Sequence, residues 1–121
     1  IKVLLVGPES LLPHKNKLSE NCKISNIDDA IPKSDVVMFL RIQHERHQTF
    51  ELETKNYNAD FGLNKSRIEK LKKNAIIMHP GPVNRDVEIL SELVEHDKSR
   101  IVKQMENDGY TRKAILEWIY S

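Results

Sequence analysis

The sequence has almost no cysteine, since Cys22 is the single one among 121 residues. An internal disulfide is therefore excluded, and the count favours a reducing, cytoplasmic setting. Net charge is also nearly absent, because 19 basic residues balance 18 acidic residues to a formal +1. Without a basic excess the chain lacks the electrostatic footprint of a nucleic-acid-binding protein, so we expect no nucleic-acid partner.

Long apolar runs and a leader segment are missing as well. No run approaches the length of a membrane span and no signal peptide is visible, so we expect no membrane partner. The sequence also lacks an initiator methionine, because it begins with IKVLLVGPES, inside an apolar strand. We therefore expect residues 1–121 to be part of a longer polypeptide. No repeat, low-complexity tract or domain boundary interrupts them.

The composition that remains, 39% hydrophobic and 31% charged, is typical of one globular domain. Continuous apolar runs predict three buried parallel strands, at residues 2–6, 35–40 and 75–78. Asn26 is the expected cap of a helix over 27–31, and Asn64 the expected cap of a helix that ends at Asn74. The alternation of strands and helices predicts an α/β fold, a parallel sheet flanked by helices.

Weaker signals describe the other segments. Residues 7–25 read as a loop with a short helical turn, and residues 91–95 and 99–106 as two short helical segments. Gly109 is expected to separate these from a final helix over 110–120. The apolar stripe of that helix predicts packing, either against this domain or against the rest of a longer chain; it consists of Ala114, Ile115, Trp118 and Ile119.

The first candidate site is a run of polar residues that directly follows the second strand. Ligands of open α/β sheets bind beyond the carboxyl ends of the strands, where Arg41 and Gln43 lie. His79 and Pro80 follow the neighbouring strand, so both segments are expected to converge on one cleft. Arg41 can hold a carboxylate with two hydrogen bonds, which favours an anionic small molecule. The alternative interpretation is that a solvated loop simply begins there.

A metal site is a further alternative for the same segment. His44 and His47, with Glu45 or His79, contain enough donor atoms for one. However, the helical zinc-protease pattern places two histidines four residues apart around a glutamate, and in HERH they are three apart. Histidines that are hydrogen-bonded within the fold are therefore the preferred interpretation.

The second candidate site is the segment MHPGPVNRDVEI. Prolines on both sides stiffen the backbone around Gly81, and glycine lets a main chain approach a ligand closely. A cis peptide bond before a proline is one possible geometry. The alternative is a rigid turn that serves structure alone. Asn84, Arg85, Asp86 and Glu88 are then expected to form a polar network under it.

Three motifs together give the chain a resemblance to a known family. LRIQHERHQ, AIIMHPGPVNRDVEI and LVEHDKSRIVKQMEN resemble the aspartate carbamoyltransferase catalytic chain, over nearly all of residues 33–107. Ornithine-specific relatives carry His-Cys-Leu-Pro where this sequence has His79-Pro80-Gly81-Pro82. The resemblance implies carbamoyl transfer from carbamoyl phosphate to L-aspartate in pyrimidine biosynthesis, without a metal or an organic cofactor. It also implies the C-terminal, aspartate-binding domain of a two-domain α/β chain that forms homotrimers.

The resemblance also implies roles for particular residues. Arg41 and Gln43 would bind aspartate, and Glu45 would orient Arg41. The backbone carbonyls of Pro80, Gly81 and Pro82 would meet the amino group of carbamoyl phosphate and the attacking amine. Regulatory or fused pyrimidine-pathway subunits are further partners that such a chain can have.

Departures from the family limit what these 121 residues are expected to do alone. The carbamoyl phosphate domain and the first strand–helix unit of the aspartate domain are absent, and NDGYTRKAILEWIYS is looser than the family pattern. We therefore expect the isolated residues to be inactive. Two alternatives remain open at this stage: a non-catalytic carbamoyltransferase-like module for assembly or regulation, and a carbamoyltransferase that acts on another amine.

Overall fold

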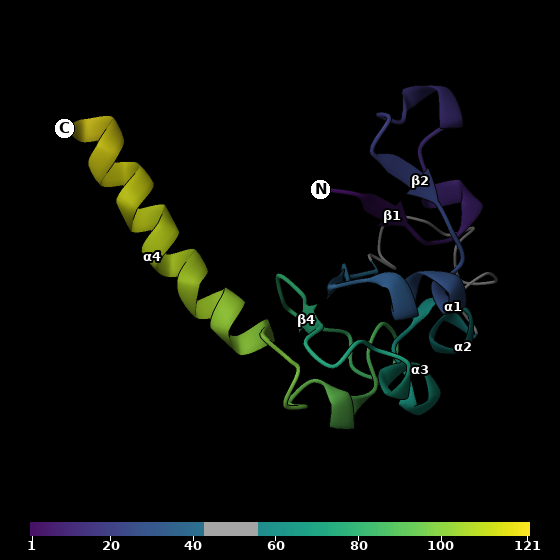
Figure 1. The fold of residues 1–121 in the computed structure, drawn as a ribbon. Coiled ribbons are helices and arrows are strands. Elements are labelled where there is room, and N and C mark those ends of the chain that lie inside the picture. The colour runs from purple at the N-terminus through teal and green to yellow at the C-terminus, as the bar shows by residue number, and fades with distance from the viewer. Residues whose placement is uncertain (43–55) are drawn as a thin grey trace.

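The computed structural model describes residues 1–42 and 56–121. Within them, four short strands form two parallel pairs that helices and turns connect (Figure 1). Strand β1 (Val3–Leu5) pairs with β2 (Cys22–Ile24), and β3 (Val36–Met38) pairs with β4 (Ile76–Met78). Parallel strands and helices confirm the predicted α/β class, with the strands arranged as two separate pairs.

Strand β2 lies in a segment that was predicted to be loop. Two turns of 3-10 helix, η1 (Glu9–Leu11) and η2 (Lys15–Lys17), come before it. The Val3 amide donates to the Asn21 carbonyl at 2.8 Å, and the Ser25 amide donates to the Leu5 carbonyl at 2.9 Å. These bonds join residues far apart in sequence. A three-residue strand therefore forms without a local pattern that could predict it.

Both predicted helix caps are confirmed. The Asn26 side chain accepts a hydrogen bond from the Asp29 amide at 2.8 Å and begins α1 (Ile27–Ala30), which continues into the turn η3 (Ile31–Lys33). Asn64 caps α3 (Lys65–Glu69), which follows α2 (Tyr57–Phe61). Helix α3 ends at Glu69, five residues before its predicted end, because the following amides bond to carbonyls only three residues back.

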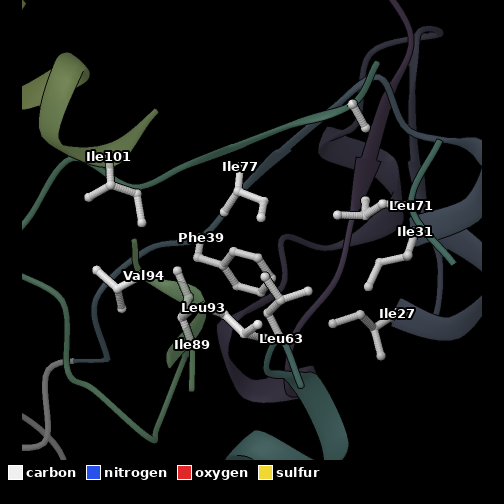
Figure 2. Close-up of a cluster of buried hydrophobic side chains, with 11 residues drawn as sticks. Ile27, Ile31, Phe39, Leu63, Leu71, Ile77, Ile89, Leu93, Val94 and Ile101 are labelled. Carbon is white, nitrogen blue, oxygen red and sulfur yellow. The ribbon is translucent and has the colours of Figure 1, made fainter. Parts of the chain in front are cut away.

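The hydrophobic core lies on one face of the β3–β4 pair. Figure 2 shows the Phe39 ring between Ile77 and Leu63, and the cluster extends toward Ile27 and Ile101 at its two ends. The expectation that β3 is buried on both faces is wrong. Successive side chains of a strand point to opposite faces, and the face that carries Val36, Met38 and Leu40 is 50–63% exposed.

Helix α4 (Ile101–Tyr120) follows the 3-10 turn η5 (Ser91–Leu93) and projects away from the rest of the chain (Figure 1). The predicted break at Gly109 is wrong. A helical glycine costs only about 1 kcal/mol. The ion pair between Asp108 and Arg112 spans it at 2.7 Å and supports the continuous helix.

The apolar stripe predicted on this helix does not pack against the described part of the domain. Trp118 is 79% exposed and Ile119 61% exposed, whereas Ile101 at the start of α4 is buried in the core. No helix among the described residues is both long and apolar enough to cross a membrane.

Candidate functional site

The two predicted site segments leave the sheet at the same edge. Strands β3 and β4 are parallel neighbours in the register Val36↔Ile76 to Met38↔Met78. The Phe39 amide extends the pairing by donating to the Met78 carbonyl at 2.9 Å. Arg41 therefore follows one strand end, and the HPGP loop (residues 79–82) follows the adjacent one. Gln43 and Glu45 lie outside the described residues, so their predicted roles stay predictions.

A buried polar network holds the backbone next to Arg41 in place. Glu88 is fully buried, and its Oε1 accepts hydrogen bonds from the Ile42 amide at 2.6 Å and from Asn84 Nδ2 at 3.1 Å. Asn84 Nδ2 also donates to the Ile42 carbonyl at 3.0 Å. Both backbone groups of Ile42 are thus held, while the Arg41 side chain is exposed to solvent. The network fixes the direction in which the chain leaves β3.

The four residues predicted to form one polar network divide into two groups. Asn84 and Glu88 form the buried group under Ile42. Arg85 and Asp86 form an exposed group: Arg85 pairs with Glu95, and Asp86 accepts bonds from the Ser91 amide and hydroxyl at 2.8 and 2.7 Å. Those bonds lower the pKa of Asp86, and the Arg85 hydrogen bond lowers the pKa of Glu95. This second group stabilises the turn before η5.

The HPGP loop uses up its own backbone donors. Pro80 and Pro82 have no amide hydrogen. The Gly81 amide donates to His79 Nδ1 at 2.9 Å, and the His79 amide donates to the Oε1 atom of Gln104 on α4 at 3.0 Å. Gly81 has a φ of 72°. The Gly81–Pro82 peptide bond is cis, which is the geometry named above for a bond before a proline.

The carbonyl groups of the same loop, unlike its amides, are available to a ligand. Among the described residues, no hydrogen bond ends on the carbonyl of Pro80, Gly81 or Pro82. Pro80 and Pro82 are exposed and Gly81 is half-buried, so the loop is accessible from outside. A loop whose backbone amides are both occupied and whose carbonyls are open can only accept hydrogen bonds through its backbone. It is suited to the N–H groups of a ligand and unsuited to an anion.

The ring of His79 is a fixed structural acceptor. The side chain is fully buried, and burial lowers its pKa, an effect that the negative charge of Glu88 opposes. The neutral ring with its hydrogen on Nε2 leaves Nδ1 free to accept from Gly81. His79 Nε2 and Glu88 Oε2 are the buried side-chain atoms in the described ranges without a hydrogen-bond partner.

Burial, with a smaller contribution from the Glu88 charge, raises the pKa of nearby Tyr57 to about 12.

The metal alternative gains no support from the described residues. No three His, Cys, Asp or Glu side chains gather there as a metal site would require. His79, the described member of the predicted set, uses Nδ1 to accept from Gly81. His44, Glu45 and His47 lie outside the described residues.

No pattern in the sequence predicts the contact between Gln104 and the HPGP loop. The Gln104 side chain contacts His79, which lies 25 residues earlier in the sequence. Other polar residues of α4 look the same in the sequence, so nothing local distinguishes Gln104 from them. Glu88 was identified only as one member of a possible network, and its burial was not foreseen. Both contacts depend on tertiary structure, which local patterns do not encode.

Comparison with known proteins assigns the chain to a family. The family described as aspartate/ornithine carbamoyltransferase, Asp/Orn binding domain, matches residues 2–119. The aspartate carbamoyltransferase catalytic subunit of Fusobacterium nucleatum is 54% identical over 98% of this chain and 38% of its own length. That of Leuconostoc citreum is 52% identical over 93% of this chain and 37% of its own length. The chain therefore spans less than two fifths of these relatives.

Solved structures agree. The aspartate transcarbamoylase of Trypanosoma cruzi in complex with carbamoyl aspartate and phosphate superposes with a TM-score of 0.77. It is 27% identical and covers 96% of this chain and 39% of its own. The ornithine carbamoyltransferase of Thermus thermophilus shares the fold at a TM-score of 0.75 and 22% identity. On the match to its Asp/Orn binding domain and on these identities, the chain belongs to the aspartate/ornithine carbamoyltransferase family.

Proposed function

We propose that residues 1–121 are the aspartate-binding portion of a longer aspartate carbamoyltransferase chain (the full-length catalytic chain). The reaction is carbamoyl transfer from carbamoyl phosphate to the amino group of L-aspartate. The amine nitrogen attacks the carbamoyl carbon, the bond from that carbon to the phosphate oxygen breaks, and phosphate and one amine proton leave. The product is N-carbamoyl-L-aspartate, an intermediate of pyrimidine biosynthesis.

The observation that carries this proposal is the acceptor character of the HPGP loop beside Arg41. Both substrates present nitrogen donors: the amino group of carbamoyl phosphate and the attacking amine. The loop offers open carbonyls and no free amide, while Arg41 adds a cation at the adjacent strand end. A site with hydrogen-bond acceptors on one side and a guanidinium on the other suits an amino acid with an extra carboxylate.

The proposed roles follow from that arrangement. Arg41 binds a carboxylate of aspartate, Gln43 contacts the same substrate, and Glu45 orients Arg41. The carbonyls of Pro80, Gly81 and Pro82 hold the carbamoyl amino group. As the attacking nitrogen forms its bond it gains positive charge, which nearby carbonyl oxygens stabilise more strongly in the transition state than in the ground state. Holding both nitrogens on one rigid loop also lowers the entropic cost of the encounter.

Relatives support the choice of substrates and extend the proposal. The Trypanosoma cruzi enzyme has been solved with carbamoyl phosphate and with N-(phosphonacetyl)-L-aspartic acid. The curated relatives that match over nearly the whole chain are named aspartate carbamoyltransferase catalytic subunits. We extend the proposal to a cytoplasmic enzyme that assembles as a homotrimer.

The first test is substitution of Arg41 in the full-length catalytic chain. Arg41→Ala is expected to raise the KM for L-aspartate by about 10- to 100-fold, because a charge-assisted carboxylate contact contributes roughly 1.5–3 kcal/mol. The KM for carbamoyl phosphate should change little. Steady-state assays of N-carbamoyl-L-aspartate formation measure both constants.

The matched control is Arg85→Ala, which removes an exposed arginine whose partners are Glu95 and the Ser91 carbonyl. It should leave both KM values unchanged. An unchanged aspartate KM in Arg41→Ala would indicate another acceptor amine, and screening other amines would then identify it. A full-length chain without any carbamoyl transfer would instead indicate a non-catalytic module for assembly or regulation.

A further inference from the structure

The beginning of α4 is in direct contact with the HPGP loop. Gln104 Oε1 accepts the His79 amide hydrogen at 3.0 Å. In the next position Met105 packs against Gly81 so closely that a Cβ atom built on the glycine would lie 2.5 Å from the methionine sulfur. One turn of α4 therefore touches the loop at both of its non-proline residues.

The start of α4 is itself fixed against β4. The Ile77 amide donates to the Lys98 carbonyl at 2.9 Å, and the Arg100 amide donates to the Ile77 carbonyl at 2.8 Å. The segment before the helix thus runs beside the strand that leads into the loop, and Ile101 is buried in the core. Because strand and helix start are joined in this way, the Gln104 side chain has a defined position relative to His79.

The hydrogen bond to Gln104 decides what the loop presents to a ligand. The loop has two amide hydrogens, and His79 Nδ1 occupies the one on Gly81. The amide of His79 is part-buried, and among the described residues it donates to Gln104 Oε1. An amide left without a partner costs free energy, so the backbone would rotate to find one. Such a rotation would move the carbonyls that follow it.

We propose that Gln104 is a positioning residue of the proposed reaction: its side-chain carbonyl holds the His79 amide and thereby aims the HPGP carbonyls at the amino group of carbamoyl phosphate. The inference rests on the proposed function, since it assigns a residue that acts through the loop. Gln104 does not touch the substrate in this scheme. Its contribution is the orientation of an acceptor surface made by other residues.

Three variants of the full-length catalytic chain distinguish a positioning role of Gln104 from a role in packing alone. Gln104→Met keeps the length of the side chain and removes the acceptor. Gln104→Glu keeps an oxygen at the same reach and should restore function. Lys103→Met makes a similar change at the preceding, exposed position of the same helix, where the side chain pairs only with Glu106 among the described residues.

The discriminating measurement compares two phosphate compounds. Acetyl phosphate has a methyl group where carbamoyl phosphate has an amino group, so it cannot donate to the loop carbonyls. Gln104→Met is expected to raise the KM for carbamoyl phosphate by about 10- to 100-fold, the size of effect that a misplaced reacting group produces. The inhibition constant of acetyl phosphate should stay unchanged. Gln104→Glu and Lys103→Met should both resemble the unchanged chain in both constants.

A second measurement follows the hydrogen bond directly. Amide hydrogen exchange at His79 should accelerate in Gln104→Met and stay slow in Gln104→Glu. Equal weakening of both phosphate compounds would show general damage and would overturn the proposal, as would unchanged carbamoyl phosphate kinetics in Gln104→Met. If the unsubstituted full-length chain transfers no carbamoyl group, the proposed function fails first, and this role fails with it.

Discussion

Glu88 joins the two halves of the candidate site through a single buried oxygen. Its Oε1 accepts from the Ile42 amide, next to Arg41, and from Asn84, two residues beyond the HPGP loop. Its Oε2 has no hydrogen-bond partner among the described residues. A buried carboxylate is costly to desolvate, and the hydrogen bonds of Oε1 to both segments offset part of that cost.

Removing this side chain should destabilise the fold measurably. Glu88→Ala leaves the Ile42 amide and the Asn84 side chain without their acceptor, which is expected to lower the free energy of unfolding by about 2–4 kcal/mol. Urea unfolding followed by circular dichroism measures the loss. A loss below about 0.5 kcal/mol, the range of ordinary surface substitutions, would contradict the importance of the network.

The matched variant Glu88→Gln keeps an acceptor oxygen and removes the charge. Its loss of stability should therefore be smaller than that of Glu88→Ala. The pKa of Tyr57 should fall below its value of about 12, because the Glu88 charge contributes to the upward shift. It should remain above the ordinary value of 10, since burial is the larger cause. Titration of the Tyr57 ring signals in an NMR spectrum distinguishes the two effects.

At the scale of elements, Arg67 joins three short helices. The arginine of α3 is buried, and its Nη1 donates to the carbonyls of Asn58 and Gly62 at 3.1 and 2.8 Å. Its Nε and Nη2 donate to the two carboxylate oxygens of Asp28 on α1 at 3.3 and 3.0 Å. Helices of four or five residues are too short to be stable alone, so such contacts hold them in place.

This cluster predicts a pH dependence with a definite sign. The Arg67 hydrogen bond is the largest cause that lowers the pKa of Asp28 in the fold. The ionised carboxylate therefore stabilises the fold above its unfolded pKa of about 4, and that contribution disappears as pH falls through the lower, folded pKa. Asp28 is half exposed, so solvent screening keeps the contribution small.

Arg67→Met should accordingly lower stability more at pH 7 than at pH 2.5. As Asp28 becomes protonated, a growing share of the remaining loss comes from the two carbonyl bonds, which do not titrate. Thermal unfolding of both proteins across this pH range is the measurement. Lys70→Met, which removes the exposed second partner of Asp28 at 3.4 Å, is the control and should change stability by less than about 0.5 kcal/mol. A pH-independent difference between Arg67→Met and the unsubstituted chain would rule out the Asp28 contribution.

The elements that were predictable from the sequence are those whose signals are local. Asn26 and Asn64 each bond to an amide three residues ahead, so the cap and its helix occur in one short segment. Strand β2 was missed because its partner strand is about twenty residues away. The continuity of α4 was missed because the cost of Gly109 is offset by ion pairs that a rule about glycine does not consider.

At the scale of the whole molecule, the proximity of the two candidate segments was predictable, and the contacts that support them were not. Parallel strands bring their carboxyl ends together, so the order of strands in the sequence was enough to place Arg41 beside the HPGP loop. The contacts from Glu88 and Gln104 connect residues 46 and 25 positions apart. Those contacts depend on how the strands and α4 pack together, which local residue patterns do not reveal.

The acceptor character of the HPGP loop predicts what residues 1–121 can do alone. A phosphate group needs several donors or cations, and this loop has its two amides occupied and its carbonyls open. In the proposed enzyme, the phosphate of carbamoyl phosphate must therefore be bound by groups other than this loop. The isolated residues 1–121 are expected to form no N-carbamoyl-L-aspartate, whereas the full-length catalytic chain forms it under the same conditions.

Binding measurements make this prediction specific to the phosphate. Isothermal titration of the isolated residues with inorganic phosphate should show far weaker binding than the full-length catalytic chain, because the loop carbonyls repel an anion and a phosphate needs more donors than Arg41 alone supplies. The same titration of the full-length catalytic chain is the control and should saturate. Turnover by the isolated residues would contradict the prediction. It would also require residues 1–121 to supply donors for the phosphate from outside the HPGP loop, whose two amides are occupied.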